Sequence, residues 1–400
     1  MSLLCHAGGI TGTLLEQKSG LPLMQAYLLI VDLPYKHKVC TTSTTTTKEV
    51  TESFLHPFLQ TNVISNYGIQ LEEDCLTMPL ALDPAFAKAI AAKTEAAKAL
   101  PSAADHDVKT RRTRITVAFE AEFSKLPATP DVEHQIHQIQ SYDGQTISVY
   151  RFFKKNESGG GGRPAIFHTH GGGTIQGDVK LFIPALSFQV QQTGVQIFSV
   201  DYRLAPEHPF PTPEEDSYAG LKWLYEHADE FGVDRSRIAV SGESAGGKLA
   251  LGLSLMAWDR NLSPPLAKQI LIYPMLDDRN TTPNPALEPF ADGFWSYSDN
   301  ITAWTALLGK DVIGTDKVSP YAAPARAQNL DGLPPTYIEV GELDIFRDED
   351  IALAGRIAAA NISVEVHVHP GVPHAFEVFA PDIDVTQRAM VDRMRMYSSV

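Results

Sequence analysis

From about residue 164 to the end of the chain, short apolar runs alternate with longer stretches of helical periodicity. The short runs have the length of buried strands, and the longer stretches repeat apolar side chains every three or four residues. This alternation predicts an α/β fold, in which helices cover both faces of a mostly parallel sheet. The predicted strands are residues 164–170, 195–202, 237–242, 268–274, 335–341 and 363–370. The predicted helices are residues 214–231, 245–258, 348–360 and 385–397.

The pattern is different before this alternation begins. Residues 135–141 and 145–153 read as strands, and the Tyr-Asp-Gly turn between them predicts a hairpin. Residues 78–130 have helical periodicity, with Asp83 as the expected N-cap and Pro84 at the first helical position. The chain is therefore expected to place a helical segment and a hairpin ahead of the parallel strands.

Two segments fit neither pattern. Residues 1–77 have no clear period and contain the polar tract TTSTTTTK at residues 41–48, so we expect a mobile extension or a poorly packed appendage. Residues 277–332 are rich in Pro, Asn, Asp and aromatic side chains, which predicts a lid or a binding loop. Its aromatic side chains either cover a pocket or form the core of the lid; they are Phe290, Phe294, Trp295, Tyr297 and Trp304.

Charge and cysteine usage exclude several functional classes. The chain has 33 basic and 48 acidic side chains and a net charge of −15, so we expect no nucleic-acid partner and no anionic membrane surface. Three cysteines are too few for a disulfide framework, which favours a reducing compartment. The apolar run at residues 21–33 is too short and too interrupted to cross a bilayer. We therefore expect a soluble cytoplasmic protein without an integral membrane segment.

One short motif joins a predicted strand to a predicted helix. Gly242-Glu-Ser244-Ala-Gly246 has the pattern G-x-S-x-G, which in this setting indicates a nucleophile elbow. The two glycines permit the sharp turn, because side chains there would collide with neighbouring backbone. The turn raises the Ser244 hydroxyl above the sheet and places the N–H of Ala245 at a helix start, where the helix dipole favours an anion. The same motif without the strand and helix arises by chance in glycine-rich turns.

A serine nucleophile needs a base, and the base needs a carboxylate to orient it. In a fold with this elbow, the acid and then the histidine follow the serine along the chain. Asp344 comes directly after the predicted strand at residues 335–341, and we assign it as the acid. His374 lies in the loop beyond the strand at residues 363–370, and we assign it as the base.

Other side chains compete for these two roles. Glu342 lies closer to the strand end, whereas Asp348 and Asp350 fit the first turn of the next helix, where acidic side chains complement the dipole. His367 and His369 alternate with valines inside the predicted strand, so we expect them to share one partly exposed face of the sheet.

The glycine run HGGG at residues 170–173 leaves the carboxyl end of the first predicted strand of the alternation. Glycines let the backbone approach a substrate closely and aim its N–H groups at one point, which an oxyanion hole requires. Which two glycines donate is left open. His170 precedes the acid in chain order, so we expect a loop brace hydrogen-bonded to backbone rather than the base. The candidate oxyanion-hole residues are Gly171, Gly172, Gly173 and Ala245.

Together these residues closely resemble the hormone-sensitive-lipase-like family of α/β-hydrolases, a group of intracellular serine esterases. The resemblance covers roughly residues 78–400 and is carried by four blocks in order: residues 170–173, 201–211, 242–246, and the pair Asp344 and His374. It implies an α/β-hydrolase fold with a helical cap and a Ser-His-Asp triad that works through an acyl-enzyme. It also implies that no metal or cofactor takes part, and that the protein forms a homodimer, as family members often do.

The resemblance also implies a division of the chain and a class of substrate. Residues 1–77 are an N-terminal extension of unknown role, residues 78–130 a helical cap segment, and residues 131–400 the catalytic domain with a lid-like insertion at about residues 277–332. The expected substrates are small-molecule carboxylic esters with short to medium acyl chains. The alternatives are an esterase for lactones or secondary metabolites and a ligand-binding receptor on the same fold.

Two positions depart from the family pattern. Glu243 stands where many members have Asp, which keeps the charge. Thr174 stands where an aromatic side chain is common, which we expect to change the space near the acyl site. In the proline-rich block at residues 201–211, Glu207 and His208 allow a metal or acid–base interpretation, but a brace for the loop explains them.

Overall fold

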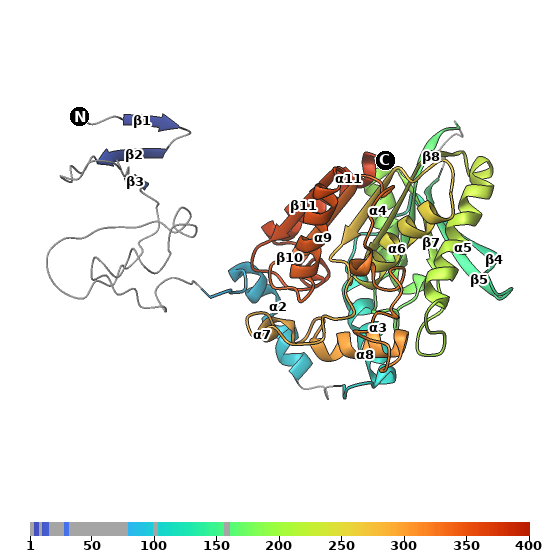
Figure 1. Ribbon diagram of the computed structural model, residues 1–400, viewed down its shortest axis with the longest axis horizontal. Helices are drawn as coiled ribbons and strands as arrows, with labels where there is room; N and C mark the ends of the chain where they lie inside the picture. Colours follow the sequence, from blue (N-terminus) through green and yellow to red (C-terminus); the bar gives the residue numbers. More distant parts are fainter. Residues whose placement is uncertain (1–3, 8–9, 16–27, 32–78, 99–102, 156–160) are drawn as a thin grey trace. The chain divides into compact units, whose positions relative to one another are not determined.

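The computed structural model describes residues 4–7, 10–15, 28–31, 79–98, 103–155 and 161–400 (Figure 1). It divides into two units, Met1–Pro79 and Leu80–Val400. In the first unit, β1 (Leu4–Ala7), β2 (Ile10–Leu15) and β3 (Leu28–Val31) form an antiparallel sheet. The sequence pattern predicts no strands here, because runs of four to six residues show too little alternation to be recognised. The polar tract at residues 41–48 lies outside the described residues.

The second unit is built on an eight-stranded sheet with the order β11-β10-β9-β8-β6-β7-β5-β4. The strands from β11 to β7 run parallel, whereas β5 pairs antiparallel with both β7 and β4. The prediction of a mostly parallel sheet is therefore confirmed, as is the antiparallel hairpin. The strands are β4 (Val132–Gln140), β5 (Thr146–Lys154), β6 (Arg163–Thr169), β7 (Gln196–Asp201), β8 (Val233–Glu243), β9 (Lys268–Ile272), β10 (Thr336–Gly341) and β11 (Val364–His369).

Helices cover both faces of this sheet, and an apolar core fills the space on each side. One core packs α5 (Thr212–His227), α6 (Ala245–Asp259) and α9 (Arg347–Ala359) against the strands. The other core packs α4 (Val179–Thr193) and α11 (Asp384–Ser398) against the opposite face. None of the helices within the described ranges has the length and apolarity needed to cross a bilayer.

The sequence pattern misses α4. Pro184 lies inside the helix, and a proline in that position usually interrupts helical periodicity. Asp178 nevertheless caps the helix, because its side chain accepts a hydrogen bond of 2.8 Å from the Leu181 N–H. Gly194, in the left-handed conformation with φ 72°, ends it. Tertiary packing of Phe182 and Leu186 against the sheet then outweighs the proline.

Two helices precede the hairpin, as the periodicity of residues 78–130 predicts. Asp83 caps α2 (Pro84–Lys98) by accepting hydrogen bonds from the N–H groups of Ala85 and Phe86. The second helix, α3 (Val108–Phe123), packs on α4 through ring contacts of Phe119 and Phe123 with Phe182. This contact places α3 along one side of the sheet layer.

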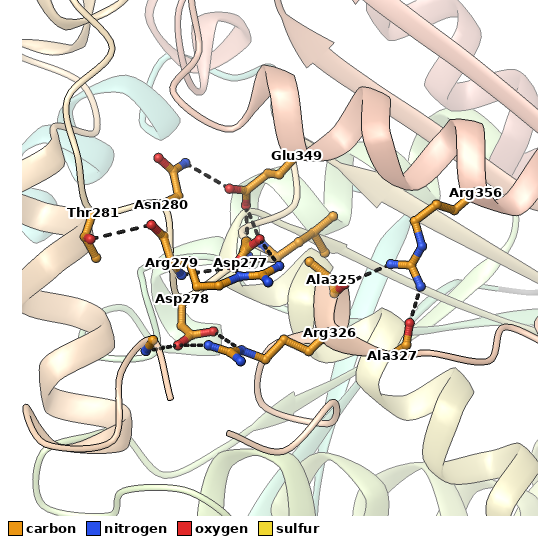
Figure 2. Close-up of polar contacts among 12 residues, drawn as sticks. Asp277, Asp278, Arg279, Asn280, Thr281, Ala325, Arg326, Ala327, Glu349 and Arg356 are labelled. Carbon is orange, nitrogen blue, oxygen red and sulfur yellow. Dashed lines mark hydrogen bonds and ion pairs between the residues drawn. The ribbon is translucent and has the colours of Figure 1, made fainter. Parts of the chain in front are cut away.

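The segment at residues 277–332 is tied to α9 by partly buried polar contacts (Figure 2). Glu349 accepts hydrogen bonds from the Asp277 N–H at 3.2 Å and from the Asn280 side chain at 2.8 Å. Asp278 and Arg326 form an ion pair within the segment itself. These contacts fix the base of the segment, which contains α7 (Glu288–Ala291), α8 (Tyr297–Leu308) and the short helix η5 (Pro324–Arg326).

Candidate active site

Ser244 lies in a sharp turn between the end of β8 and the start of α6. Its φ of 57° is positive, which is uncommon for a residue other than glycine. The flanking glycines make the turn possible: a Cβ atom on Gly242 would lie 2.4 Å from the Gly246 carbonyl carbon, and one on Gly246 would lie 1.9 Å from the Thr169 oxygen. The Ser244 N–H donates to the Ile272 carbonyl at 2.8 Å, which holds the turn against the next strand.

The loops after β10 and β11 bring an acid and a histidine to this serine. His374 Nε2 lies 3.0 Å from Ser244 Oγ, and His374 Nδ1 lies 2.6 Å from Asp344 Oδ2. Asp344 is fully buried, and its other oxygen accepts a hydrogen bond of 2.9 Å from the Phe346 N–H. The structure thus places the three side chains in hydrogen-bonded order, with the imidazole between the hydroxyl and the carboxylate. We refer to them below as the Ser244 triad.

Aromatic side chains surround the His374 ring. The ring of Tyr273 lies 4.6 Å from it, centroid to centroid, and that of Phe346 lies 5.2 Å away, both in edge-to-face geometry. Trp295, from the segment at residues 277–332, lies 6.4 Å away. These rings exclude water from the sides of the imidazole and limit its rotation.

The glycine run after β6 approaches the elbow closely. A Cβ atom on Gly171 would lie 3.0 Å from the Glu243 carbonyl oxygen, and Gly172 has a φ of 118° that favours glycine. Gly171 and Gly172 line the same cavity as Ser244. Gly173 instead packs against the Trp295 ring, since a Cβ atom there would lie 2.4 Å from a ring carbon. Of the three glycines of the run, Gly171 and Gly172 are therefore the two that line the cavity.

The remaining candidate donor, Ala245, is the first residue of α6. The first N–H groups of a helix have no partner within the helix, and the dipole makes their surroundings favourable for an anion. Ala245 follows the nucleophile directly, so its N–H belongs to the same turn as the Ser244 hydroxyl.

His170 has the bracing role that its chain position predicts. Its Nδ1 lies 2.8 Å from the Gly171 carbonyl, and its ring stacks on Tyr202 at 4.3 Å. Burial lowers the pKa of His170 despite the hydrogen bond to the backbone. The neutral imidazole therefore packs on Tyr202 and holds the glycine run through its contact with the Gly171 carbonyl.

A second set of serine, histidine and acid lies beneath the elbow, and sequence reasoning misses it. His168 Nδ1 lies 2.9 Å from Ser199 Oγ, and His168 Nε2 lies 2.8 Å from Glu243 Oε2. Ser199 and His168 are fully buried on β7 and β6, and Glu243 is the residue before the nucleophile. We call these residues the Ser199 triad. Glu243, which stands where many family members have Asp, supplies the carboxylate that contacts His168.

The competing acids have other partners. Glu342 accepts a hydrogen bond of 2.9 Å from the Gly371 N–H, and Asp348 pairs with Arg347 at 2.8 Å in the first turn of α9. Asp350, in the same turn, is fully buried, and burial raises its pKa well above the ordinary value. None of the three lies in hydrogen-bond contact with His374 among the residues that the structure describes.

The two strand histidines differ from each other. His367 is partly exposed, as predicted, and its Nε2 lies 2.7 Å from Glu365. The prediction is wrong for His369, which is only 7% exposed. The Phe376 ring, 5.5 Å away in the segment after β11, covers it. Strand alternation alone does not reveal such cover, because the covering residue follows the strand in the sequence.

Thr174 does not have the predicted effect on the acyl site. It is fully buried and is not among the residues lining the cavity at Ser244. Its φ of 60° turns the backbone, and its hydroxyl donates to the Gly173 carbonyl at 2.5 Å. The space at the end of the glycine run is filled by Trp295, which packs on Gly173 from the segment at residues 277–332.

The aromatic side chains of that segment divide between the two expected roles. Phe294 and Trp295 line the cavity, whereas Tyr297 and Trp304 are buried in the core around α8. Phe290 does not line the cavity and is partly exposed.

Glu207, one of the two residues discussed as possible metal ligands, has a structural partner. Glu207 forms an ion pair of 2.6 Å with Arg112 of α3, so this part of the proline-rich block braces a loop. The hydrogen bond from Arg112 lowers the pKa of Glu207 to about 2. One group in the described part of the chain has its atoms close enough to hold an ion, namely Glu365, His367 and Asp392. Arg395 already pairs with both carboxylates of this group, Glu365 and Asp392, and offsets part of their charge.

The Ser244 triad opens onto a cavity of about 640 Å³. Its lining contains Ser244, His374, Gly171 and Gly172, together with apolar side chains from several helices. Cavities of this size hold ligands as large as drug molecules. The arrangement brings a buried serine hydroxyl, an imidazole, a carboxylate and two glycines of the run together at a largely apolar cavity.

Comparisons with known proteins agree with this geometry. Residues 166–378, more than half of the chain, match the family described as alpha/beta hydrolase fold. Esterase LipI of Mycobacterium tuberculosis is 35% identical over 57% of this chain and 71% of its own length. Ethyl acetate hydrolase of Pseudomonas putida is 27% identical over 77% of this chain and 94% of its own length. A solved bacterial heroin esterase has a TM-score of 0.72 and 34% identity over 80% of this chain and 98% of its own.

Proposed function

Because this chain belongs to the hormone-sensitive-lipase-like family of α/β-hydrolases and is an ester hydrolase, we propose that Ser244 is its nucleophile, His374 its general base and Asp344 the orienting acid. The observation that carries this assignment is the position of the His374 ring. It lies 3.0 Å from the Ser244 hydroxyl on one side and 2.6 Å from the Asp344 carboxylate on the other. Two nitrogens with these partners match the geometry of a serine hydrolase triad.

In the first half of the proposed reaction, Ser244 Oγ attacks the ester carbonyl while His374 Nε2 takes its proton. The tetrahedral intermediate then collapses, and the same proton passes from His374 to the departing alcohol. In the second half, His374 deprotonates a water molecule that attacks the acyl-enzyme and forms a second tetrahedral intermediate. This intermediate collapses by breaking the bond between Ser244 Oγ and the acyl carbon, and His374 returns the proton to Ser244 Oγ as the carboxylic acid leaves. Asp344 holds the ring in one orientation and stabilises its cationic form in both halves.

The developing oxyanion has backbone donors close to Ser244. We assign this role to the N–H groups of Gly171, Gly172 and Ala245, since Gly173 packs against Trp295 instead of lining the cavity. Each such donor contributes roughly 10²–10³ in rate where it has been removed in other hydrolases. The substrates are small carboxylic esters. The short to medium acyl chains that the family resemblance implies belong to this proposal.

The other elements have proposed roles around this centre. We assign α3 to a cap over the cavity and residues 277–332 to its lid, because Phe119 and Trp295 line the cavity from these segments. We assign α2 to the same cap, because the ring of Phe86 lies 5.8 Å from that of Phe294, which also lines the cavity. Residues 1–77 keep no assigned role. A cytoplasmic location and a homodimer are carried forward as proposals from the cysteine content and the family resemblance.

A pair of serine variants tests the assignment. We expect Ser244→Ala to abolish ester turnover and covalent labelling by a fluorophosphonate, because the attacking oxygen is removed. Ser199→Ala is the matched control, since Ser199 also contacts a histidine but is fully buried on β7. This control retains turnover and labelling. Labelling that persists in Ser244→Ala contradicts the assignment, and saturable binding of esters without turnover by the unmodified protein favours a receptor instead.

A further inference from the structure

The segment that follows β9 lies between the nucleophile and the base of the Ser244 triad. The Ile272 carbonyl accepts a hydrogen bond of 2.8 Å from the Ser244 N–H, and the Met275 N–H donates to the Ser244 carbonyl at 3.1 Å. Tyr273, between these two residues, has a φ of 36°, a positive value that is uncommon for a bulky side chain. Its ring lies 4.6 Å from that of His374. Tyr273 therefore touches the base from a segment that is bonded to the nucleophile.

The hydroxyl of Tyr273 is held by a carboxylate. It donates a hydrogen bond of 2.5 Å to Glu377 Oε1 on α10 (Phe376–Phe379), and the tyrosine side chain is buried. Burial raises the pKa of Tyr273 well above its ordinary value, and the negative charge of Glu377 acts in the same direction. The hydroxyl thus keeps its proton and remains a donor to Glu377 at neutral pH.

Arg393 of α11 joins this carboxylate to the interior of the sheet. Its guanidinium donates to Glu377 Oε1 at 2.9 Å and to Glu339 Oε1 on β10 at 2.9 Å. Glu377 Oε2 has no hydrogen-bond partner in the part of the chain that the structure describes, so Oε1 alone connects Tyr273 to Arg393. Because Arg393 and Glu339 are buried, the tyrosine ring is tied to the core of the protein. We call Glu377, Arg393 and Glu339 the Tyr273 anchor.

The same arginine serves a second tyrosine, which lies away from the Ser244 triad. Tyr337 donates to Glu339 Oε2 at 2.6 Å, and its ring lies 5.5 Å from that of His367 on β11. Tyr273 and Tyr337 have the same chemistry, since each is a buried phenol that donates to a glutamate bound by Arg393. They differ in the histidine that the ring touches, so the chain itself contains a matched pair.

The ring contact matters because His374 changes its hydrogen-bond partner during the proposed reaction. Its Nε2 first contacts Ser244 Oγ, then the departing alcohol and then the attacking water. The bond from Nδ1 to Asp344 persists, but a single bond leaves the imidazole free to tilt about it. The contact with the Tyr273 ring does not depend on which oxygen Nε2 faces. A displacement of about 1 Å in a reacting group costs roughly 10²-fold in rate, so a contact that prevents tilting has a large effect.

From these contacts we propose that Tyr273 and Glu377 are positioning residues for the base. Glu377, held by Arg393, fixes the Tyr273 ring in place. The ring in turn keeps His374 in line while the imidazole exchanges its partners. The proposal rests on the proposed function, because it takes His374 as the base. Since His374 acts in both halves of the reaction, loss of the anchor slows acylation and deacylation together, which lowers kcat and leaves KM nearly unchanged.

Two tyrosine variants compare the two positions directly. Tyr273→Phe and Tyr337→Phe each remove one buried hydroxyl that donates to a glutamate, so we expect similar losses of melting temperature. We expect Tyr273→Phe to lower kcat for p-nitrophenyl acetate about tenfold with KM within about twofold, and Tyr337→Phe to keep both constants within about twofold. Steady-state kinetics measure the difference, with circular dichroism as the check on folding. Equal kcat values in the two variants, or an effect of Tyr273→Phe on KM alone, overturn the proposal.

A double-mutant cycle tests whether Glu377 acts through the tyrosine. Glu377→Gln keeps the size of the side chain but removes the charge that pairs with Arg393, and we expect kcat to fall by about threefold or more. Glu365→Gln is the matched control, because Glu365 also pairs with an arginine but lies on β11, and it leaves kcat within about twofold. We expect the double variant of Tyr273→Phe and Glu377→Gln to be no slower than the slower single variant. Losses that multiply in the double variant overturn the proposal.

The positioning role and the proposed function fail in different ways. If Tyr273→Phe does not fold, Glu377→Gln decides the question, and a kcat equal to that of Glu365→Gln overturns the positioning role. An inactive Ser244→Ala, together with equal kcat values in Tyr273→Phe and Tyr337→Phe, rejects the positioning role alone. Hydrolysis that persists in Ser244→Ala rejects the proposed function.

Discussion

Two sets of serine, histidine and carboxylate meet at neighbouring backbone positions, Glu243 and Ser244, yet they differ in what surrounds the serine. The Ser199 triad lies on β6, β7 and β8, whereas the Ser244 triad lies in the turn and loops after β8, β10 and β11. In the Ser244 triad the distances are 3.0 Å from hydroxyl to imidazole and 2.6 Å from imidazole to carboxylate. In the Ser199 triad the corresponding distances are 2.9 Å and 2.8 Å. Ser244 projects from a turn with positive φ at the wall of a cavity, whereas Ser199 is fully buried in the middle of β7.

The difference shows that hydrogen-bonded order alone does not make a nucleophile. A serine must also reach a carbonyl carbon, and the charge that forms must meet donors. Only Ser244 has both a cavity beside it and the glycine run opposite. The Ser199 triad instead connects β6, β7 and β8 and holds the strand that leads to the elbow. Under the proposed mechanism, similar hydrogen-bonded groups support reaction in one set and structure in the other.

The largest effect that separates the two sets is expected from the acid of the Ser244 triad. Asp344→Asn keeps the size of the side chain but favours the wrong tautomer of His374, so we expect kcat for ester hydrolysis to fall by roughly 10⁴-fold. Steady-state kinetics on a soluble ester measure this loss, with circular dichroism as the check on folding. Glu365→Gln is the matched control, because Glu365 also contacts a histidine, at 2.7 Å on β11, but lies far from any nucleophile in the sheet order. A kcat within tenfold of the unmodified protein in Asp344→Asn contradicts the acid assignment.

A smaller effect, on stability, is expected from the acid of the Ser199 triad. Glu243→Ala leaves the buried His168 Nε2 without its partner, which costs about 1–3 kcal/mol of the free energy of unfolding. Urea denaturation followed by tryptophan fluorescence measures the change. The matched substitution Glu365→Ala removes a partner from a partly exposed histidine and costs less than about 1 kcal/mol. If both variants lose the same free energy of unfolding, the contact of Glu243 with His168 stabilises the protein no more than the contact of Glu365 with His367 does.

The pH dependence of the free energy of unfolding gives a further test of the role of Glu243 in the Ser199 triad. Burial raises the pKa of Glu243, but the neighbouring His168 and its hydrogen bond outweigh burial and hold that pKa below the ordinary value of 4.5. A carboxyl with a lowered folded-state pKa stabilises the protein above pH 4.5, and this contribution disappears as the pH falls through the folded-state pKa. We therefore expect the difference in unfolding free energy between the unmodified protein and Glu243→Gln to shrink as the pH decreases below 4.5. A difference that stays constant down to pH 3 contradicts the assignment.

Local sequence patterns predict the Ser244 centre well, because each part is encoded by neighbouring residues. The motif around Ser244 and the strand before it define a turn, and Asp344 and His374 each follow a recognisable strand. The same patterns do not reveal the contact of His168 with Glu243, which are 75 positions apart. That contact depends on the register of β6 on β8, in which Thr169 lies opposite Gly242.

Other features escape sequence reasoning for related reasons. Helix α4 contains Pro184, and its stability comes from packing on the sheet rather than from local propensity. The contact of Trp295 with Gly173 joins two loops 122 positions apart, the difference between 295 and 173, so the sequence alone does not show what replaces the missing aromatic side chain at Thr174. Both features depend on contacts that only the folded chain brings together.

Helix α11 both lines the cavity and makes buried contacts in the interior, and this affects how substitutions can change substrate selectivity. One side of the helix forms a wall of the cavity at Ser244, while Arg393 and Tyr397 on it bind Glu339 and Ser241 in the interior. Random substitution along α11 that changes substrate preference therefore also risks destabilising the fold. Ile115 and Phe119 of α3 line the same cavity with apolar side chains, so a mutational library aimed at new esters retains more folded variants when it samples these two positions.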